Sequence, residues 1–110
     1  MHSLPVPWKV LSSAVGAGIL TDGWNLADEV EKPAPDESRT FLVEIVFATP
    51  FETTPVVQLG MTGFDVDQRD SGRVTLKAEQ ITPQGFTASI TTWAATRLYA
   101  VEFNWLAIGA

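Results

Sequence analysis

Cysteine is absent from the chain, and histidine occurs once among its 110 residues. Without cysteine the protein has no disulfide, no thiolate nucleophile and no zinc site built on sulfur. His2 stands alone near the N-terminus, so a Ser-His-Asp triad and a cluster of histidine metal ligands both lack partners. We therefore expect no catalytic residue, no metal site and no cofactor, and we interpret the protein as a non-enzyme.

Positive charge is scarce as well. Seven lysines and arginines are scattered among thirteen carboxylates, which gives a net charge of −6. Phosphate backbones are bound by clustered basic side chains, and this sequence has no such cluster. Nucleic acid is therefore not an expected partner.

Apolar runs long enough to cross a membrane are also missing. The uncharged stretch at residues 10–20 contains serines and glycines and is shorter than the ~20 apolar residues that a spanning helix needs. The same stretch weakly resembles the core of a secretory signal peptide, but only Lys9 precedes it and glycine disfavours a helical core. We expect a glycine-bearing strand here and no membrane span.

What the chain does contain is apolar residues in alternation with polar ones. A hydrophobic content of 45% with 18% charged residues is typical of a folded chain, and 110 residues can bury one core. Residues 1–13 include Pro5 and Pro7 and show no clear period, which indicates an N-terminal arm. Residues 14–110 form the expected domain.

Six segments have the composition of β-strands, and no segment has the period of a helix. They are SAVGAGIL (13–20), TFLVEIVF (40–47), PVVQLGMTGF (55–64), RVTLKAEQI (73–81), GFTASITTW (85–93) and LYAVEFNWLAIG (98–109). Short strands separated by turns predict an all-β fold, an antiparallel β-sandwich of six strands. Residues 22–38, rich in carboxylates and proline, are expected to form a long surface loop, and loops of that length are usually functional.

The turn sequence DVDQRDSG allows a calcium-binding interpretation, because Asp65, Asp67 and Asp70 resemble the start of an EF-hand loop. The match fails in detail: Arg69 replaces an oxygen ligand and Leu76 replaces the closing glutamate. We favour a solvated hairpin turn.

Four side chains suit a carbohydrate better than they suit catalysis. A sugar offers a C–H face that packs on an aromatic ring and hydroxyls that need directional partners. Trp93, Tyr99, Arg73 and Asp36 supply rings, a guanidinium and a carboxylate, and Trp93 falls on the polar face of its strand. By composition alone we favour the alternative that the aromatic residues seal the sandwich end and the charges lie on the surface. A glycosidase built on two carboxylates is a further, less specific alternative.

The sequence resembles a known family over residues 14–109. The segments that carry the resemblance are VFATPFETTPVVQLGMTGFDVD (46–67), RVTLKAEQITPQGFTASITTW (73–93) and TRLYAVEFNWLAIG (96–109). In their order and spacing they resemble the H-type lectins, the family of snail agglutinins and of the C-terminal domain of discoidins. The resemblance implies a trimer of six-stranded sandwiches that binds galactose or N-acetylgalactosamine where subunits meet.

Carried over residue by residue, the resemblance also implies roles for this chain. Asp36 would accept protons from sugar hydroxyls, Arg73 would donate to them, and Trp93 and Tyr99 would line the pocket. The chain departs from the snail proteins at Ala94, where they carry a histidine that reads the acetamido group.

A second departure is Ala34, where the snail proteins have a glycine that approaches the sugar. Because disulfides are excluded, a trimer must rest on strand packing, and the outward apolar residues Leu42 and Val46 are candidates for its interface. The resemblance thus implies a secreted or surface lectin active in adhesion that forms a homotrimer or a higher oligomer. The alternative is a non-binding trimerisation domain of an adhesin or phage-like fibre.

Overall fold

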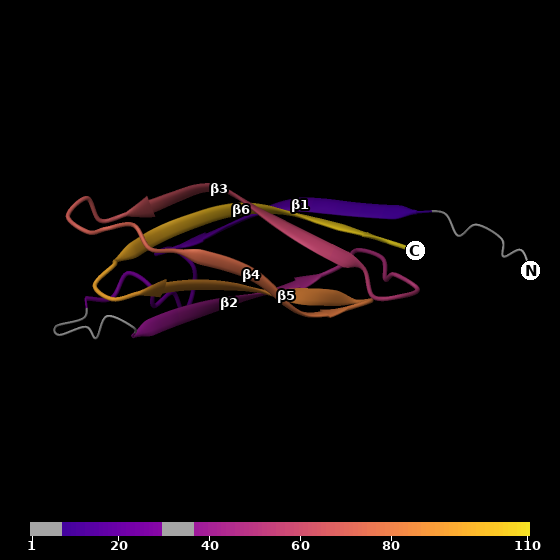
Figure 1. The fold of residues 1–110 in the computed structure, drawn as a ribbon, viewed down its shortest axis with the longest axis horizontal. Helices are drawn as coiled ribbons and strands as arrows, with labels where there is room; N and C mark the ends of the chain where they lie inside the picture. The colour runs from indigo at the N-terminus through magenta and orange to yellow at the C-terminus, as the bar shows by residue number, and fades with distance from the viewer. Residues whose placement is uncertain (1–7, 30–36) are drawn as a thin grey trace, which may run out of the picture.

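The computed structural model describes residues 8–29 and 37–110, so the expected site residues Ala34 and Asp36 lie outside the described residues. Within the described part, six strands are joined by turns and loops (Figure 1). They are β1 (Lys9–Gly18), β2 (Ser38–Val46), β3 (Val56–Val66), β4 (Thr75–Thr82), β5 (Gly85–Trp93) and β6 (Leu98–Gly109). This confirms the predicted all-β fold of six strands.

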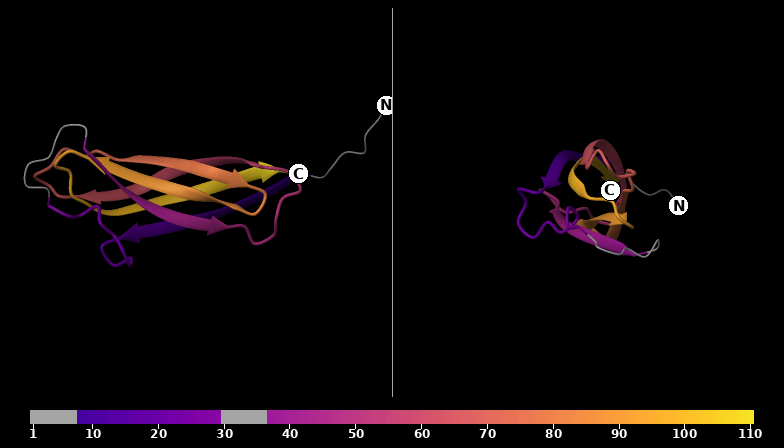
Figure 2. Two further views of the ribbon diagram at one scale, coloured as in Figure 1. Left: turned by 90° about the horizontal axis from the view of Figure 1, so that it is seen from below. Right: turned by 90° about the vertical axis from the view of Figure 1, so that its left-hand side faces the viewer.

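The strands form two three-stranded sheets, ordered β1-β6-β3 and β2-β5-β4. Every pair of neighbouring strands is antiparallel. The two sheets lie in layers, and the end-on view of Figure 2 shows their strands gathered around a common interior. The central strands, β5 and β6, are consecutive in the chain and belong to different sheets.

The core lies between the sheets and is built from alternate residues of each strand. In β6 the odd-numbered residues from Val101 to Gly109 are buried, while Glu102 and Asn104 are exposed, as a period of two requires. Near the C-terminal end of β6, Trp105 packs edge-on against Phe86, with ring centroids 5.6 Å apart, and lies at the same distance from Phe47. These aromatic contacts close one end of the sandwich.

The predicted faces of β2 are confirmed. Phe41, Val43 and Ile45 point toward the core, whereas Leu42 and Val46 point outward and are 55% and 79% exposed. The outer face of β2 therefore carries apolar side chains that this chain alone does not cover.

Strand β1 differs from expectation at both ends. It begins at Lys9, which pairs with Gly109, so residues 9–13 belong to a sheet and not to the expected arm. Two consecutive serines, at positions 12 and 13, interrupt the alternation of apolar and polar residues that would indicate a strand. Residues 9–13 are extended because they pair with β6, which the local sequence does not indicate. At the other end the strand stops at Gly18, and Leu20 is 98% exposed in the following turn.

Gly85, the first residue of β5, allows β5 to lie close to β2. A Cβ atom at this position would collide with the backbone carbonyl oxygen of Ile45 on β2. Because a backbone atom cannot move aside as the end of a side chain can, only glycine lets β5 lie this close to β2 here.

We predict that Gly85→Ala destabilises the domain by about 2 kcal/mol or more, since overpacking against backbone forces the two strands apart. Thermal unfolding followed by circular dichroism measures the effect. Gly72→Ala is the matched control, because its added methyl would make only ordinary contacts with Phe64 and Val66. Equal melting temperatures for the two variants would contradict the prediction.

Candidate functional site

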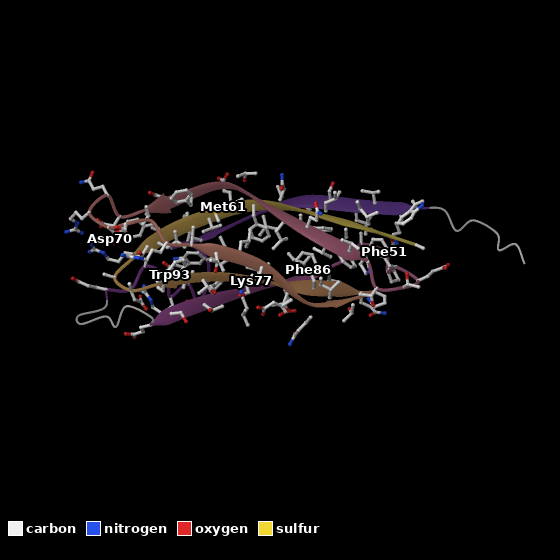
Figure 3. All side chains as sticks on the ribbon, viewed as in Figure 1. Phe51, Met61, Asp70, Lys77, Phe86 and Trp93 are labelled. Carbon is white, nitrogen blue, oxygen red and sulfur yellow. The ribbon has the colours of Figure 1, made fainter. Side chains whose placement is uncertain are left out.

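Residues 94–97 connect β5 to β6 and form the centre of the candidate site. Trp93 is the last residue of β5 and pairs with Ser38 of β2. Ala94 follows it with a φ of 56°, in the left-handed region that non-glycine residues rarely adopt. Figure 3 shows Trp93 and Asp70 at one end of the molecule and Phe51 at the other. The connection therefore lies opposite the aromatic end of the core.

Arg39 of β2 holds the backbone of this connection. Its Nη2 donates to the carbonyl oxygens of Ala94 and Thr96, at 3.1 and 2.7 Å, and its Nη1 donates to the carbonyl of Asp28 at 3.0 Å. The amide of Ala94 in turn donates to the carbonyl of Glu37 at 2.9 Å. The connection and both described ends of the 22–38 loop are thus tied together.

Arg73, which precedes β4, reaches the same connection. Its Nη1 donates to the hydroxyl oxygen of Thr96 at 2.9 Å, and that hydroxyl donates to the carbonyl of Ser71 at 2.7 Å. The side chain of Thr92 bonds the carbonyl of Arg73, and Thr92 and Thr96 are both fully buried. These bonds fix the position of the Arg73 guanidinium beside the Trp93 end of β5.

Tyr99, near the start of β6, is bonded to Asp67. The phenol donates to Oδ2 of Asp67 at 2.8 Å, and Arg69 donates to both carboxylate oxygens through its Nε, its Nη2 and its backbone amide. These Arg69 bonds, with help from Tyr99, hold the pKa of Asp67 well below its usual range. The ionised Asp67 in turn raises the pKa of Tyr99.

Arg97 joins this group to the β5–β6 connection. Its Nε and backbone amide donate to Oδ2 of Asp70, and its Nη2 donates to Oδ1, all within 3.0 Å. These bonds lower the pKa of Asp70, and a bond from the Asp67 amide to the Arg97 carbonyl closes the group. The turn at 67–72 is therefore anchored, and our expectation of a solvated turn is wrong for Asp67, which is buried.

The same contacts bear on the calcium interpretation. Both Asp67 and Asp70 already accept several hydrogen bonds from arginine, which occupy the oxygens that a cation would need. Within the described ranges, no group of three or more metal-ligating side chains comes together.

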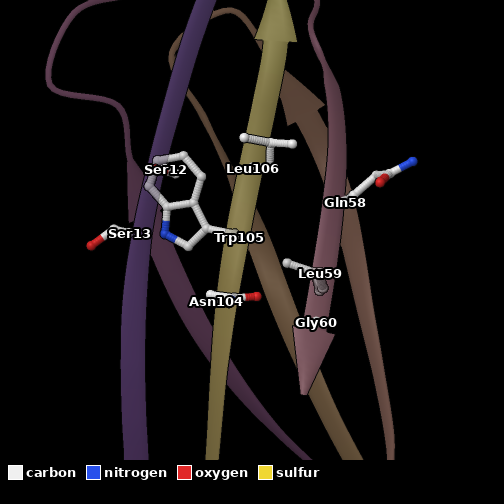
Figure 4. A pocket seen from close by; sticks show the side chains of 8 residues that line it. All are labelled: Ser12, Ser13, Gln58, Leu59, Gly60, Asn104, Trp105 and Leu106. Atoms are coloured by element: carbon white, nitrogen blue, oxygen red, sulfur yellow. The ribbon is translucent and has the colours of Figure 1, made fainter. Parts of the chain in front are cut away.

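A hollow lies elsewhere, on the outer side of the β1-β6-β3 sheet (Figure 4). It measures about 480 Å³ and is lined by uncharged residues that include Ser12, Gly60, Asn104 and Leu106. Asn104 lies across Gly60, where a Cβ atom would come within 2.8 Å of its amide oxygen. This hollow has none of the expected site residues.

Comparison with known proteins identifies the fold. The sequence pattern of the H-type lectin domain matches residues 42–108. The chain belongs to the H-type lectin domain family. It is 40% identical over 72 residues to the protein of ATP synthase subunits region ORF 7 from Fuscovulum blasticum, covering 66% of this chain and 63% of that one. It is 30% identical over 73 residues to discoidin-2 from Dictyostelium discoideum, covering 64% of this chain and 28% of that one.

Solved structures agree with the family assignment. Wild-type discoidin II from Dictyostelium discoideum superposes on 96% of this chain and 39% of its own with a TM-score of 0.75 at 24% identity. A second structure, recombinant discoidin II, gives a TM-score of 0.73 at the same identity and covers 40% of that chain. The H-type lectin domain described here spans less than two thirds of each of these relatives. The predicted resemblance is confirmed, and the protein carries the fold of an H-type lectin domain.

In this lectin domain the described site residues gather at one end. Trp93 and Ala94 are consecutive at the start of the β5–β6 connection and Arg73 bonds Thr96 of the same connection, whereas Tyr99 belongs to the other sheet and bonds Asp67. A lone subunit therefore presents Trp93 and Tyr99 from two different sheets.

Sequence reasoning missed the residues that hold this end of the lectin domain in place. They are Arg39, Asp67, Asp70, Thr96 and Arg97. The only local sign of Asp67 and Asp70 was the number of carboxylates in DVDQRDSG. A solvated turn and an ion-paired turn can have this same composition, so the sequence does not distinguish them.

We predict that the domain loses stability as the pH falls below about 5. Asp67 and Asp70 have folded-state pKa values below the ordinary 3.8, so they stabilise the fold above that pH and lose the effect as they become protonated. Melting temperature against pH measures this. The double variant Asp67→Asn, Asp70→Asn should melt lower at pH 7 and depend less on acid, while Glu52→Gln, at the opposite end, should keep the wild-type slope. A wild-type slope in the double variant would contradict the assignment.

Proposed function

We propose that this H-type lectin domain binds terminal galactose or N-acetylgalactosamine through Asp36, Arg73, Trp93 and Tyr99, at sites formed where subunits of a homotrimer meet. The observation that carries the proposal is the anchoring of Arg73 to Thr96 beside Trp93, in a chain of this family. The function is binding alone, without catalysis.

The chemistry of Trp93 and Arg73 fits a sugar. Trp93 lies on the hydroxyl-bearing outer face of β5, outside the buried core, so its indole is available to pack against the C–H face of a pyranose. Arg73 is held by one of its nitrogens, and a guanidinium has further N–H groups to donate to sugar hydroxyls. These two groups supply the apolar and the directional part of recognition.

Ala94 bears on which sugar is preferred. A methyl group stands where the snail proteins carry a histidine, so this position offers no hydrogen bond to an acetamido group. We propose that galactose and N-acetylgalactosamine bind with similar affinity. Ala34, with its methyl in place of a glycine, would narrow the approach to either sugar.

The outer face of the β1-β6-β3 sheet is our first candidate for the trimer interface. Its edge strands carry small outward residues, such as Ala14 and Gly16 on β1 and Gly60 on β3, which flank the longer side chains of β6. At one end Val10 and Val56 lie on either side of Ile108 in register. Small residues permit close approach, and an exposed apolar row stabilises association when a partner covers it.

Leu42 and Val46 on β2 form the second candidate for the interface. They are exposed, but Glu44 stands between them and accepts a hydrogen bond from Thr87. Covering this face would remove a carboxylate from water, which costs free energy. The β1-β6-β3 face carries a carboxylate as well, Glu102 of β6, so charge does not decide between the two faces. We place the β1-β6-β3 face first because its small residues permit close approach.

Ala14→Arg should dissociate the trimer into folded monomers, because a long charged side chain would enter a close-packed interface. Leu42→Arg, on the other sheet, is the control and should leave the trimer intact. Sedimentation velocity gives the mass of each. A trimer that survives Ala14→Arg and dissociates with Leu42→Arg would move the interface to β2.

Trp93→Ala should weaken galactose binding by about tenfold or more, equivalent to about 1.4 kcal/mol of lost stacking. Isothermal titration with methyl galactosides measures the affinity. The control is Trp8→Ala, which removes an exposed indole just before β1 and should bind as wild type. Three sites at fixed spacing raise avidity for clustered glycans. Unchanged affinity in Trp93→Ala would remove this residue from the site.

A trimerisation domain of an adhesin or phage-like fibre that has lost sugar binding is the second candidate function. The two alanines at positions 34 and 94 favour it, since both alter the pocket that the family uses. A wild-type protein that forms trimers and binds no glycan in a broad screen would select this function.

A further inference from the structure

We propose that Asp67 sets the hydrogen-bond polarity of the sugar site, because it accepts the one hydrogen bond that the Tyr99 hydroxyl can donate and leaves the phenol oxygen to act toward a ligand only as an acceptor. Asp67 is thus a specificity-determining residue that does not itself need to touch the sugar. The inference rests on the proposed function, since it requires that Tyr99 contact the ligand.

The direction of the Tyr99–Asp67 hydrogen bond follows from the partners of the carboxylate. Oδ1 accepts from the backbone amide and Nε of Arg69, both at 2.9 Å, and Oδ2 accepts from Arg69 Nη2 and Tyr99 Oη, both at 2.8 Å. Arg97 Nη2 lies 3.5 Å from Oδ1. A carboxylate surrounded by these donors is ionised and has no proton to give, so the shared proton belongs to Tyr99.

This arrangement persists over the pH range in which a lectin is used. The Arg69 bonds keep the pKa of Asp67 well below its usual range, and the bond to Asp67 raises the pKa of Tyr99 above its ordinary 10.0. Between these limits Asp67 stays ionised and Tyr99 stays protonated. The phenol therefore donates to the same partner at pH 5 and at pH 9.

The position of the carboxylate is fixed as firmly as its charge. The Asp67 side chain is only 8% exposed, although the Arg69 side chain that covers it is 68% exposed. The Asp67 amide donates to the carbonyl of Arg97, and Arg97 is held by Asp70. Rotating the phenol away from Asp67 would leave a buried acceptor with one donor fewer, which costs free energy.

A defined pattern of donors and acceptors follows for the ligand. Arg73 can only donate, so it requires a sugar oxygen that accepts. Tyr99 has only oxygen lone pairs left to offer, so it requires a sugar hydroxyl that donates. Fluorine in place of that hydroxyl supplies no proton, whereas an amino group does.

The test uses a series of galactosides with one hydroxyl at a time replaced by fluorine, titrated against the wild type and Tyr99→Phe. At one ring position the fluorine should weaken wild-type binding by about tenfold and have little effect in Tyr99→Phe, which identifies the hydroxyl that faces Tyr99. The amino sugar at that position should bind the wild type better than the fluoro sugar.

Asp67→Asn then tests the role of Asp67 itself. Without the ionised acceptor the phenol can also donate, so discrimination against the fluoro sugar should fall to about threefold or less. Asp70→Asn is the matched control, because Asp70 is bonded to Arg97 and not to Tyr99, and it should keep the wild-type discrimination. Circular dichroism checks that both variants fold.

A measurement independent of sugar comes from the single tyrosine of the chain. Absorbance of the phenolate during alkaline titration reports Tyr99 alone, and its midpoint should lie above 10 in the wild type and fall in Asp67→Asn.

The outcomes separate this inference from the proposed function. A wild type that binds no galactoside overturns both. Binding in which no position couples to Tyr99, or in which Asp67→Asn keeps the full discrimination, overturns the role of Asp67 and leaves the lectin function standing. If Asp67→Asn does not fold, equal binding of the fluoro and amino sugars by the wild type overturns the role.

Discussion

The short connection from Trp93 to Leu98 is the constraint on which the polar end of this domain depends. It joins the central strands of the two sheets, so four residues must cross a sandwich whose layers lie about 10 Å apart. Ala94 makes the crossing possible by adopting a left-handed conformation, which a non-glycine residue maintains only when its surroundings hold it there. Arg39, Arg73 and Asp70 supply those surroundings from three other segments.

The two ends of the sandwich are stabilised by different interactions. At one end, Phe47, Phe51, Phe86 and Trp105 pack ring against ring, and this packing needs no polar partner. At the other end, charges and backbone groups satisfy one another, and this arrangement contributes less stability because each charge loses water when it is buried. An end built this way can still present polar groups to a ligand in fixed orientations, which a purely apolar end cannot do.

Local alternation predicted much of the fold. The bounds of β5 and β6 were predicted to the residue, because apolar and polar residues alternate in the sequence of both segments and turns bound them. The start of β1 was not predicted, since its serines and glycines carry little pattern and its order comes from pairing with β6, about ninety residues later. Propensity cannot indicate a strand whose stability comes from its partner.

The candidate site likewise contains residues that the sequence predicted and residues that it did not. Trp93 and Arg73 were predicted from the chemistry of their side chains and from the family's motifs, and Arg73 bonds Thr96 in the connection that follows Trp93. Asp67 was misread, because its partner Tyr99 lies 32 positions away and nothing in the turn itself indicates a bond to β6. Long-range polar pairs leave no periodic signal in a sequence, whereas apolar faces do.

Pre-organisation explains why a binding end would contain such a network despite its modest stability. A sugar is surrounded by water before it binds, so each hydrogen bond in the complex only replaces one that the sugar already had. The gain in affinity then depends on how little the protein must be ordered, and Tyr99 and Arg73 are already held by Asp67 and Thr96. A hydroxyl such as that of Tyr99, which already donates its hydrogen bond within the protein, also discriminates between ligands. A ligand that offers only an acceptor to it leaves a polar group without a hydrogen bond. In the binding that we propose, therefore, the ion pairs that anchor the fold's polar end would also restrict which ligands it binds.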